Sequence, residues 1–95
     1  MKRLGGDLLF VAKLGDDILG QQALRVFQNE GIATNYIALD KETPSGVALI
    51  SVDQHAENCI VVASGANMSL GQGDIDSMEK EMLTGDVLLM QLEIP

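Results

Sequence analysis

The stretch SGVALISVDQHAENCIVVASGAN, residues 45–67, contains two apolar runs joined by a short polar connector. The runs cover residues 47–52 and 58–63, and two β-rich runs around a polar loop predict a β-hairpin. Successive side chains of a strand point to opposite faces, so both faces of this hairpin would be apolar. Such a hairpin needs two covers. The rest of the protein can supply one, and a ligand, a lid partner or a second subunit must supply the other.

Composition excludes several classes of function. Apolar residues make up 46% of the 95 residues, which is enough for a core in one small domain or in a piece of a larger one. The net charge of −8 argues against nucleic acid as a partner. No apolar run approaches the length that spans a bilayer, so we expect no membrane association. The single cysteine, Cys59, rules out an internal disulfide. Together with the lack of a visible signal peptide, it predicts a cytoplasmic location.

The segments on either side of the hairpin alternate between strand and helix patterns. The expected order is strand, helix, strand, hairpin, helix, strand, with these bounds: a strand over 8–13, a helix from Asp16-Asp17 to Gly31, a weaker strand over 35–39, a helix capped by Asp74, and a strand over 87–92. Such alternation predicts an α/β fold, a mostly parallel sheet with flanking helices, from which the hairpin protrudes. We divide the chain into a core segment (1–44), the hairpin (45–64) and a second core segment (65–95).

Two polar positions follow expected strands, where ligands gather in parallel sheets. Asp16 and Asp17 could be a metal or catalytic pair, but a helix cap is the favoured interpretation. Glu93 follows the last strand and is either a site carboxylate or a solvated chain end. At the hairpin tip, His55 lacks a second His or Cys for a metal site, so a solvated turn is expected. Cys59 is expected to be a buried structural thiol, since no histidine lies at a suitable spacing.

Four stretches in order carry a resemblance to a known family. They are LGG through GDD (4–17), SGVALI (45–50), EN through GAN (57–67) and LLMQLE (88–93). With these, the chain resembles the middle segment of the ribokinase-like (phosphofructokinase-B) carbohydrate kinases. The resemblance implies a partial ribokinase-like fold.

The resemblance also implies a function for the complete enzyme: transfer of the γ-phosphate of ATP to the 5-hydroxyl of D-ribose, with Mg and a monovalent cation as cofactors. Glu93 matches a carboxylate that hydrogen-bonds the sugar. The hairpin matches a lid, in which Ala48, Ile50 and Ile60 pack near the sugar, and a homodimer forms through the same hairpin. A closing lid would exclude water from the reaction.

The family motifs for the main sugar grip, the nucleotide and the catalytic base have no match in this chain. We therefore expect no catalytic residue, nucleotide site or metal ligand within it, and no activity of the isolated chain, because phosphoryl transfer needs a positioned base and cations. Two alternatives stay open. One is a non-catalytic module that dimerises or binds a partner through the hairpin, and the other is a different sugar or nucleoside kinase of the same family.

Overall fold

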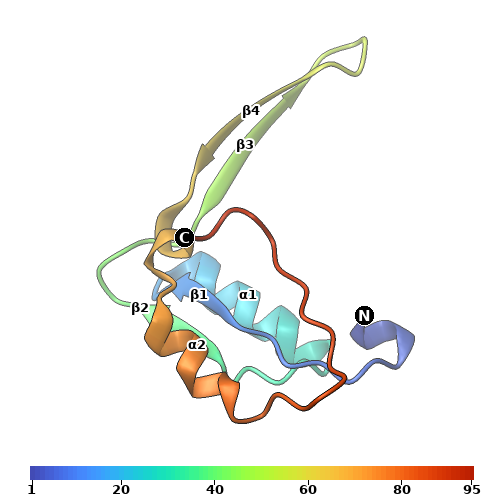
Figure 1. Ribbon diagram of the computed structural model, residues 1–95. Helices are drawn as coiled ribbons and strands as arrows, with labels where there is room; N and C mark the ends of the chain where they lie inside the picture. Colours follow the sequence, from blue (N-terminus) through green and yellow to red (C-terminus); the bar gives the residue numbers. More distant parts are fainter.

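The computed structural model describes all 95 residues, which form a small α/β body and a hairpin that projects from it (Figure 1). The elements, in chain order, are η1 (Lys2–Leu4), β1 (Ala12–Gly15), α1 (Ile18–Asn29), β2 (Ile37–Asp40), β3 (Val47–Val52), β4 (Asn58–Ala63), η2 (Gly65–Ser69) and α2 (Gln72–Glu79).

The body is built on a parallel pair of strands joined by a helix. β1 and β2 pair in parallel, with a register that runs from Ala12 opposite Ile37 to Gly15 opposite Asp40. α1 is the crossover between them. It packs back through Phe27, whose ring lies edge-on to that of Phe10 with 5.2 Å between centroids. The predicted parallel α/β arrangement is confirmed.

Both ends of α1 follow from the local sequence. Asp17 is the N-cap, and its Oδ1 accepts a hydrogen bond of 2.8 Å from the backbone N–H of Gly20. The helix ends at Asn29, and Gly31 then adopts a φ of +70°, which glycine tolerates without strain. The cap interpretation of the acidic pair is therefore confirmed at Asp17.

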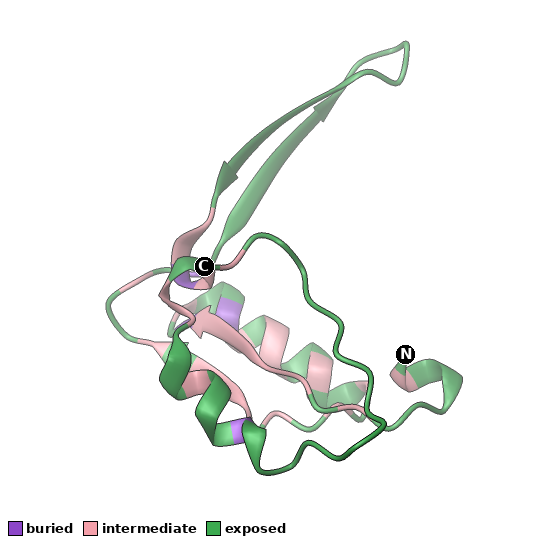
Figure 2. Cartoon of the chain, in the orientation of Figure 1, coloured by how far each residue is buried: buried purple, intermediate pink, exposed green.

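The hairpin forms as predicted, with β3 and β4 paired antiparallel from Val47 opposite Ala63 to Val52 opposite Asn58. It makes a sheet of its own, separate from the β1–β2 pair. Every residue of both strands is exposed (Figure 2). Neither of its apolar faces is covered within this chain.

The second helix starts earlier than predicted. Asp74 is not the N-cap but the third residue of α2, and its Oδ2 accepts a hydrogen bond of 2.9 Å from the N–H of Gly71 at the cap position. A carboxylate at this position binds back to the cap and satisfies a free backbone donor there. Asp74 also forms an ion pair of 3.0 Å with Lys13, which attaches α2 to β1. Met78 is the buried residue of the helix.

All three strands predicted outside the hairpin differ in the structure, and the strand predicted over 35–39 spans Ile37–Asp40. The first strand spans Ala12–Gly15 and not residues 8–13, because the chain pairs only where β2 lies beside it. Residues 87–92 form no strand: Val87 is 87% and Leu92 is 94% exposed. A strand needs a neighbour for its backbone hydrogen bonds, and no strand lies along this segment. The segment instead runs back from α2 toward the base of the hairpin (Figure 1).

Burial is concentrated at one point of the molecule. Five residues are buried, namely Gly15, Gly20, Ser45, Ala66 and Met78. All but Met78 lie where the end of β1, the start of α1 and the base of the hairpin meet (Figure 2). The best-packed part of the chain is thus the attachment point of the hairpin.

Candidate functional site

The hairpin rises from the carboxyl edge of the parallel strands. β1 ends at Gly15 and β2 at Asp40, and the N–H of Asp16 donates to the Asp40 carbonyl at 2.7 Å. Five residues after Asp40 the chain reaches Ser45, which lies against Gly15. Ligands of parallel sheets bind at this edge. The hairpin therefore stands at the edge where a ligand is expected.

A carboxylate and a hydroxyl join the body to the base of the hairpin. Asp17 Oδ2 accepts a hydrogen bond of 2.7 Å from the Ser45 N–H, and Asp17 Oδ1 accepts one of 2.8 Å from the Ser45 hydroxyl. Ser45 Oγ in turn accepts 3.0 Å from the Gly15 N–H. Hydrogen bonds to its carboxylate lower the pKa of Asp17. The bond from the N–H of Gly20 has the largest effect, followed by those from the N–H and the hydroxyl of Ser45. We call this pair, Asp17 and Ser45, the clasp.

A shallow acidic depression of ≈ 230 Å³ lies beside the clasp. Its lining residues are Asp16, Asp17, Asp40, Lys41, Glu42, Thr43 and Pro44. Hydrogen bonds from the N–H groups of Glu42 and Thr43 lower the pKa of Asp40 to about 2. The carboxylates of Asp17 and Asp40 thus accept hydrogen bonds from backbone N–H groups.

The residues present do not fit the metal ions that the family resemblance implies. No group of three or more His, Cys, Asp or Glu side chains is arranged to hold a metal ion. Both oxygens of Asp17 accept hydrogen bonds from protein donors, and Oδ1 of Asp40 accepts two. We therefore assign no metal ion to these carboxylates.

The structure brings the predicted lid residues together. Ile50 lies directly opposite Ile60 in the ladder, and Ala48, two residues before Ile50, lies opposite Val62. Residues opposite one another or two apart share a face of a sheet. Ala48, Ile50 and Ile60 therefore lie on one face. Ile50 is 61% and Ile60 is 50% exposed, so this face is free to contact a ligand.

The other face of the hairpin is also apolar and uncovered. It carries Val47 and Leu49 of β3 and their partners Ala63 and Val61 of β4. Leu49 is 71% and Val61 is 63% exposed. The hairpin therefore presents two separate apolar surfaces, as its sequence predicts.

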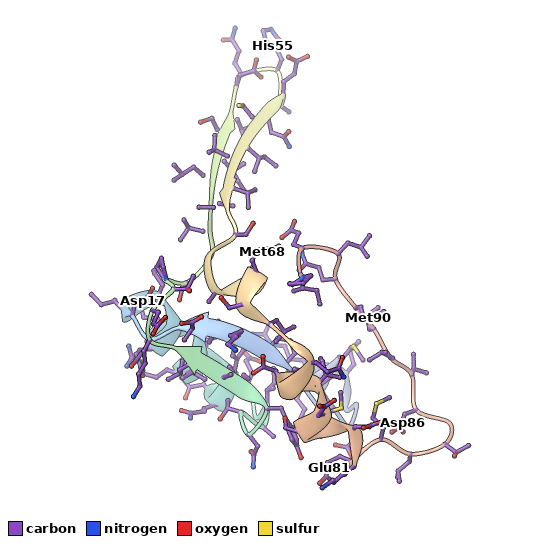
Figure 3. All side chains as sticks on the ribbon, turned by 60° about the vertical axis from the view of Figure 1, so that its left-hand side comes forward. Asp17, His55, Met68, Glu81, Asp86 and Met90 are labelled. Carbon is purple, nitrogen blue, oxygen red and sulfur yellow. The ribbon has the colours of Figure 1, made fainter.

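Glu93 lies in the last part of the chain and is exposed. The ion pairs Arg3–Glu30 and Lys13–Asp74 do not involve it. The C-terminus, two residues further on, lies beside the base of the hairpin and η2, which carries Met68 (Figures 1 and 3). The chain end that carries Glu93 thus returns to the hairpin base, although not as the predicted strand.

The hairpin tip is a solvated turn, as expected. Asp53 Oδ1 accepts hydrogen bonds from the N–H groups of His55 and Glu57, at 2.8 and 3.0 Å. His55 lies exposed at the far end of the hairpin (Figure 3). The expectation of a buried thiol at Cys59 is wrong: Cys59 is exposed, because β4 has no cover on either face.

Sequence reasoning missed the clasp and the Lys13–Asp74 ion pair. The partners are 28 and 61 residues apart, and no periodic pattern links them. One signal was present: Gly46 immediately precedes β3, and Gly65 lies two residues after the end of β4. Small residues at both ends of a hairpin indicate close backbone packing there.

None of the helices has both the length and the hydrophobicity that crossing a lipid bilayer requires.

Comparison with known proteins shows consistent similarities. Residues 1–92 match the family described as pfkB family carbohydrate kinase. Ribokinase of Haemophilus influenzae is 39% identical over 93 residues, which are 98% of this chain and 30% of that protein. Deoxyribokinase of Salmonella typhi is 34% identical over 92 residues, which are 97% of this chain and 30% of that protein.

Solved structures agree with this match. The structure of ribokinase from Giardia lamblia superposes with a TM-score of 0.82 at 31% identity, over 90% of this chain and 27% of that one. This structural similarity shows that the chain has part of the ribokinase-like fold. The chain spans about 30% of the length of the curated relatives it matches.

Proposed function

Because the chain belongs to the pfkB family of carbohydrate kinases, we propose that it supplies the lid and one sugar-binding carboxylate of a kinase that transfers the γ-phosphate of ATP to the 5-hydroxyl of D-ribose. The observation that carries this proposal is the hairpin with two uncovered apolar faces at the carboxyl edge of the parallel strands. The 39% identity to a ribokinase supports ribose as the sugar. ATP, Mg and a monovalent cation belong to the complete enzyme in this proposal, and a reducing cytoplasm is its expected location.

The face with Ala48, Ile50 and Ile60 covers the sugar in this proposal. Apolar side chains over a sugar expel water from the reaction site, and water would otherwise compete as the phosphoryl acceptor. The hairpin extends away from the body, so it must bend or tilt to close. The exposure of this face is consistent with a lid in its open position.

The opposite face meets a second copy of the protein in this proposal. Leu49 and Val61 are cross-strand partners on that face, and both are more than half exposed. Pairing two such faces removes apolar area from water on both chains, which stabilises association. The proposed assembly is a homodimer through the lid hairpins.

Glu93 is the proposed sugar ligand of the core. A carboxylate has two acceptor oxygens and can bind two neighbouring hydroxyls, and hydrogen bonds to a charged acceptor are stronger than neutral ones. The return of the chain end to the hairpin base supports this role, since a lid and a sugar carboxylate must serve the same site.

The isolated chain is not a catalyst in this proposal. No residue in it has the setting of a general base, and no glycine-rich loop with a lysine is present to hold a nucleotide. Incubation of the 95-residue chain with ATP and D-ribose should give no ribose-dependent ADP. Formation of ADP above the ribose-free control would refute this point.

Two alternatives have specific observations in their favour. The uncovered hairpin also suits a non-catalytic module that only dimerises. The 34% identity to a deoxyribokinase also suits a kinase for another sugar of this class. The first predicts a dimer with no effect of any sugar, and the second predicts a preference for a sugar other than ribose.

A hybrid enzyme tests the proposal directly. The 93 matching residues of Haemophilus influenzae ribokinase are replaced by those of this chain, and ribose-dependent ADP formation is measured. We expect activity, and we expect the KM ratio of ribose to 2-deoxyribose to stay close to that of the host enzyme. A folded dimeric hybrid without activity would contradict the kinase assignment, and a shift toward 2-deoxyribose would favour the second alternative.

A further inference from the structure

The two strands of the hairpin leave the body from a single closed point. The N–H of Ala66, after β4, donates to the carbonyl of Pro44, before β3, at 2.8 Å. A Cβ on Gly46 would lie 2.5 Å from the Ser64 carbonyl oxygen, and one on Gly65 would lie 2.4 Å from the Pro44 carbonyl oxygen. Real Cβ atoms do not approach backbone so closely. The two glycines at the hairpin base are therefore packed positions and not free swivels.

This base is attached to the body by the clasp. Ser45 donates both its N–H and its hydroxyl to the Asp17 carboxylate, and its oxygen accepts the N–H of Gly15. Ser45 is only 9% exposed and is the buried polar side chain of the chain. The clasp thus joins three segments: the end of β1, the start of α1 and the hairpin base.

Glycines allow these segments to meet backbone to backbone. A Cβ on Gly15 would lie 2.3 Å from the Ser45 nitrogen, and one on Gly20 would lie 2.0 Å from the Gly15 carbonyl oxygen. Above this point, every residue of β3 and β4 is exposed. The direction of the hairpin is therefore determined at its base.

We propose that Asp17 and Ser45 are positioning residues that fix the direction of the hairpin relative to the body. With the clasp closed, the hairpin cannot swivel at Gly46 and Gly65. It moves either by bending along its own length or together with the turn between β1 and α1. In this proposal the clasp does not bind sugar or nucleotide, and it acts by holding the apolar face of the hairpin at a set angle.

The consequence for catalysis rests on the proposed function. If the hairpin is a lid, opening the clasp widens its range of directions and lowers the fraction of molecules ready to close. Apparent affinity falls with that fraction. In the hybrid enzyme, Ser45→Ala should therefore raise the KM for ribose roughly tenfold, which corresponds to about 1.4 kcal/mol, with a smaller change in kcat.

The first test measures direction alone and needs no sugar. Spin labels are placed at Gln54 on the hairpin and Gln28 on α1, both exposed, with Cys59 replaced by serine. Pulsed dipolar spectroscopy then gives the distribution of hairpin-to-body distances. A second label pair, Gln28 with Glu79, reports whether the body stays folded. Ser45→Ala removes the hydroxyl, Ser45→Thr keeps it, and Ser51→Ala removes an exposed hydroxyl on the hairpin as a matched control.

We expect a narrow distribution of hairpin-to-body distances in the unmodified chain, in Ser51→Ala and in Ser45→Thr. In Ser45→Ala this distribution should be broad, while the distance between the labels at Gln28 and Glu79 stays unchanged. Equal distributions in Ser45→Ala and the unmodified chain would overturn the proposal. So would a broad distribution in the unmodified chain. Loss of the body distance in Ser45→Ala would also overturn it, since the clasp would then hold the fold and not the direction. An inactive hybrid with these expected distributions would instead count against the kinase proposal alone.

Discussion

Replacement of Gly20 by alanine sets two opposing effects against each other at the start of α1. Alanine has a higher helix propensity than glycine by about 1 kcal/mol, which would stabilise the helix. However, the added Cβ would lie 2.0 Å from the carbonyl oxygen of Gly15 and 3.1 Å from Ser45 Oγ. The first of these atoms is backbone and cannot rotate away, so β1 and α1 must move apart.

The steric effect should win. Overpacking of a close contact costs about 1–3 kcal/mol, and displacement of Ser45 weakens the clasp, where each hydrogen bond contributes about 1 kcal/mol. Against a gain of about 1 kcal/mol, the net loss of unfolding free energy is about 2 kcal/mol. For a chain of this size, the midpoint temperature should fall by roughly 10 °C.

Urea unfolding followed by circular dichroism measures this loss, and Gly73→Ala is the matched control. Gly73 lies near the start of α2, and a Cβ there would meet no atom within 4 Å. Only the propensity effect remains, so Gly73→Ala should be stabilising by up to about 1 kcal/mol. If Gly20→Ala proves as stable as Gly73→Ala, the close packing at the hairpin base is refuted.

Three further predictions concern the rest of the molecule. Asp74→Ala removes the cap contact to Gly71 and the ion pair with Lys13, and should lower the unfolding free energy by about 1 kcal/mol in urea titrations; an unchanged value would speak against the capping role. Asp40 has a pKa of about 2 in the folded chain, below its value in the unfolded chain. Its contribution to the free energy of unfolding is therefore complete above about pH 4 and is lost as the pH falls toward 2. In thermal melts, the difference in midpoint temperature between the parent chain and Asp40→Asn should therefore vanish near pH 2. A difference that stays constant over this pH range would contradict the assignment of the low pKa to the hydrogen bonds from Glu42 and Thr43. If the chain forms the proposed homodimer, Leu49→Lys should convert it to a monomer in sedimentation velocity, whereas Ile50→Lys, on the other face, should not; the reverse pattern would exchange the roles of the two faces.

The hairpin could be predicted to the residue because its signals are local. Two apolar β-rich runs and a polar connector determine pairing between neighbours in sequence, and β3 and β4 start and end where the runs do. The cap of α1 at Asp17 is equally local. Such features depend on residues a few positions apart, so the sequence is sufficient.

Features that depend on distant partners were not predictable in this way. Residues 87–92 have the composition of a buried strand, but whether they pair depends on a neighbouring strand that the pattern does not name. The clasp joins residues 28 apart through a single carboxylate and a single hydroxyl, without any repeat or period. The sequence identifies Asp74 as a helix-start residue, but its position within the first turn depends on the hydrogen bond that it accepts from Gly71.

The central claim is that this chain contributes a lid and a sugar-binding carboxylate to a ribose kinase. The most direct test is the steady-state KM for ribose of the hybrid enzyme with Glu93 and with Glu93→Gln. Loss of a charged hydrogen-bond acceptor should raise the KM by roughly 10- to 100-fold, while the KM for ATP stays within about twofold of the parent. An unchanged KM for ribose in an active hybrid would contradict the claim.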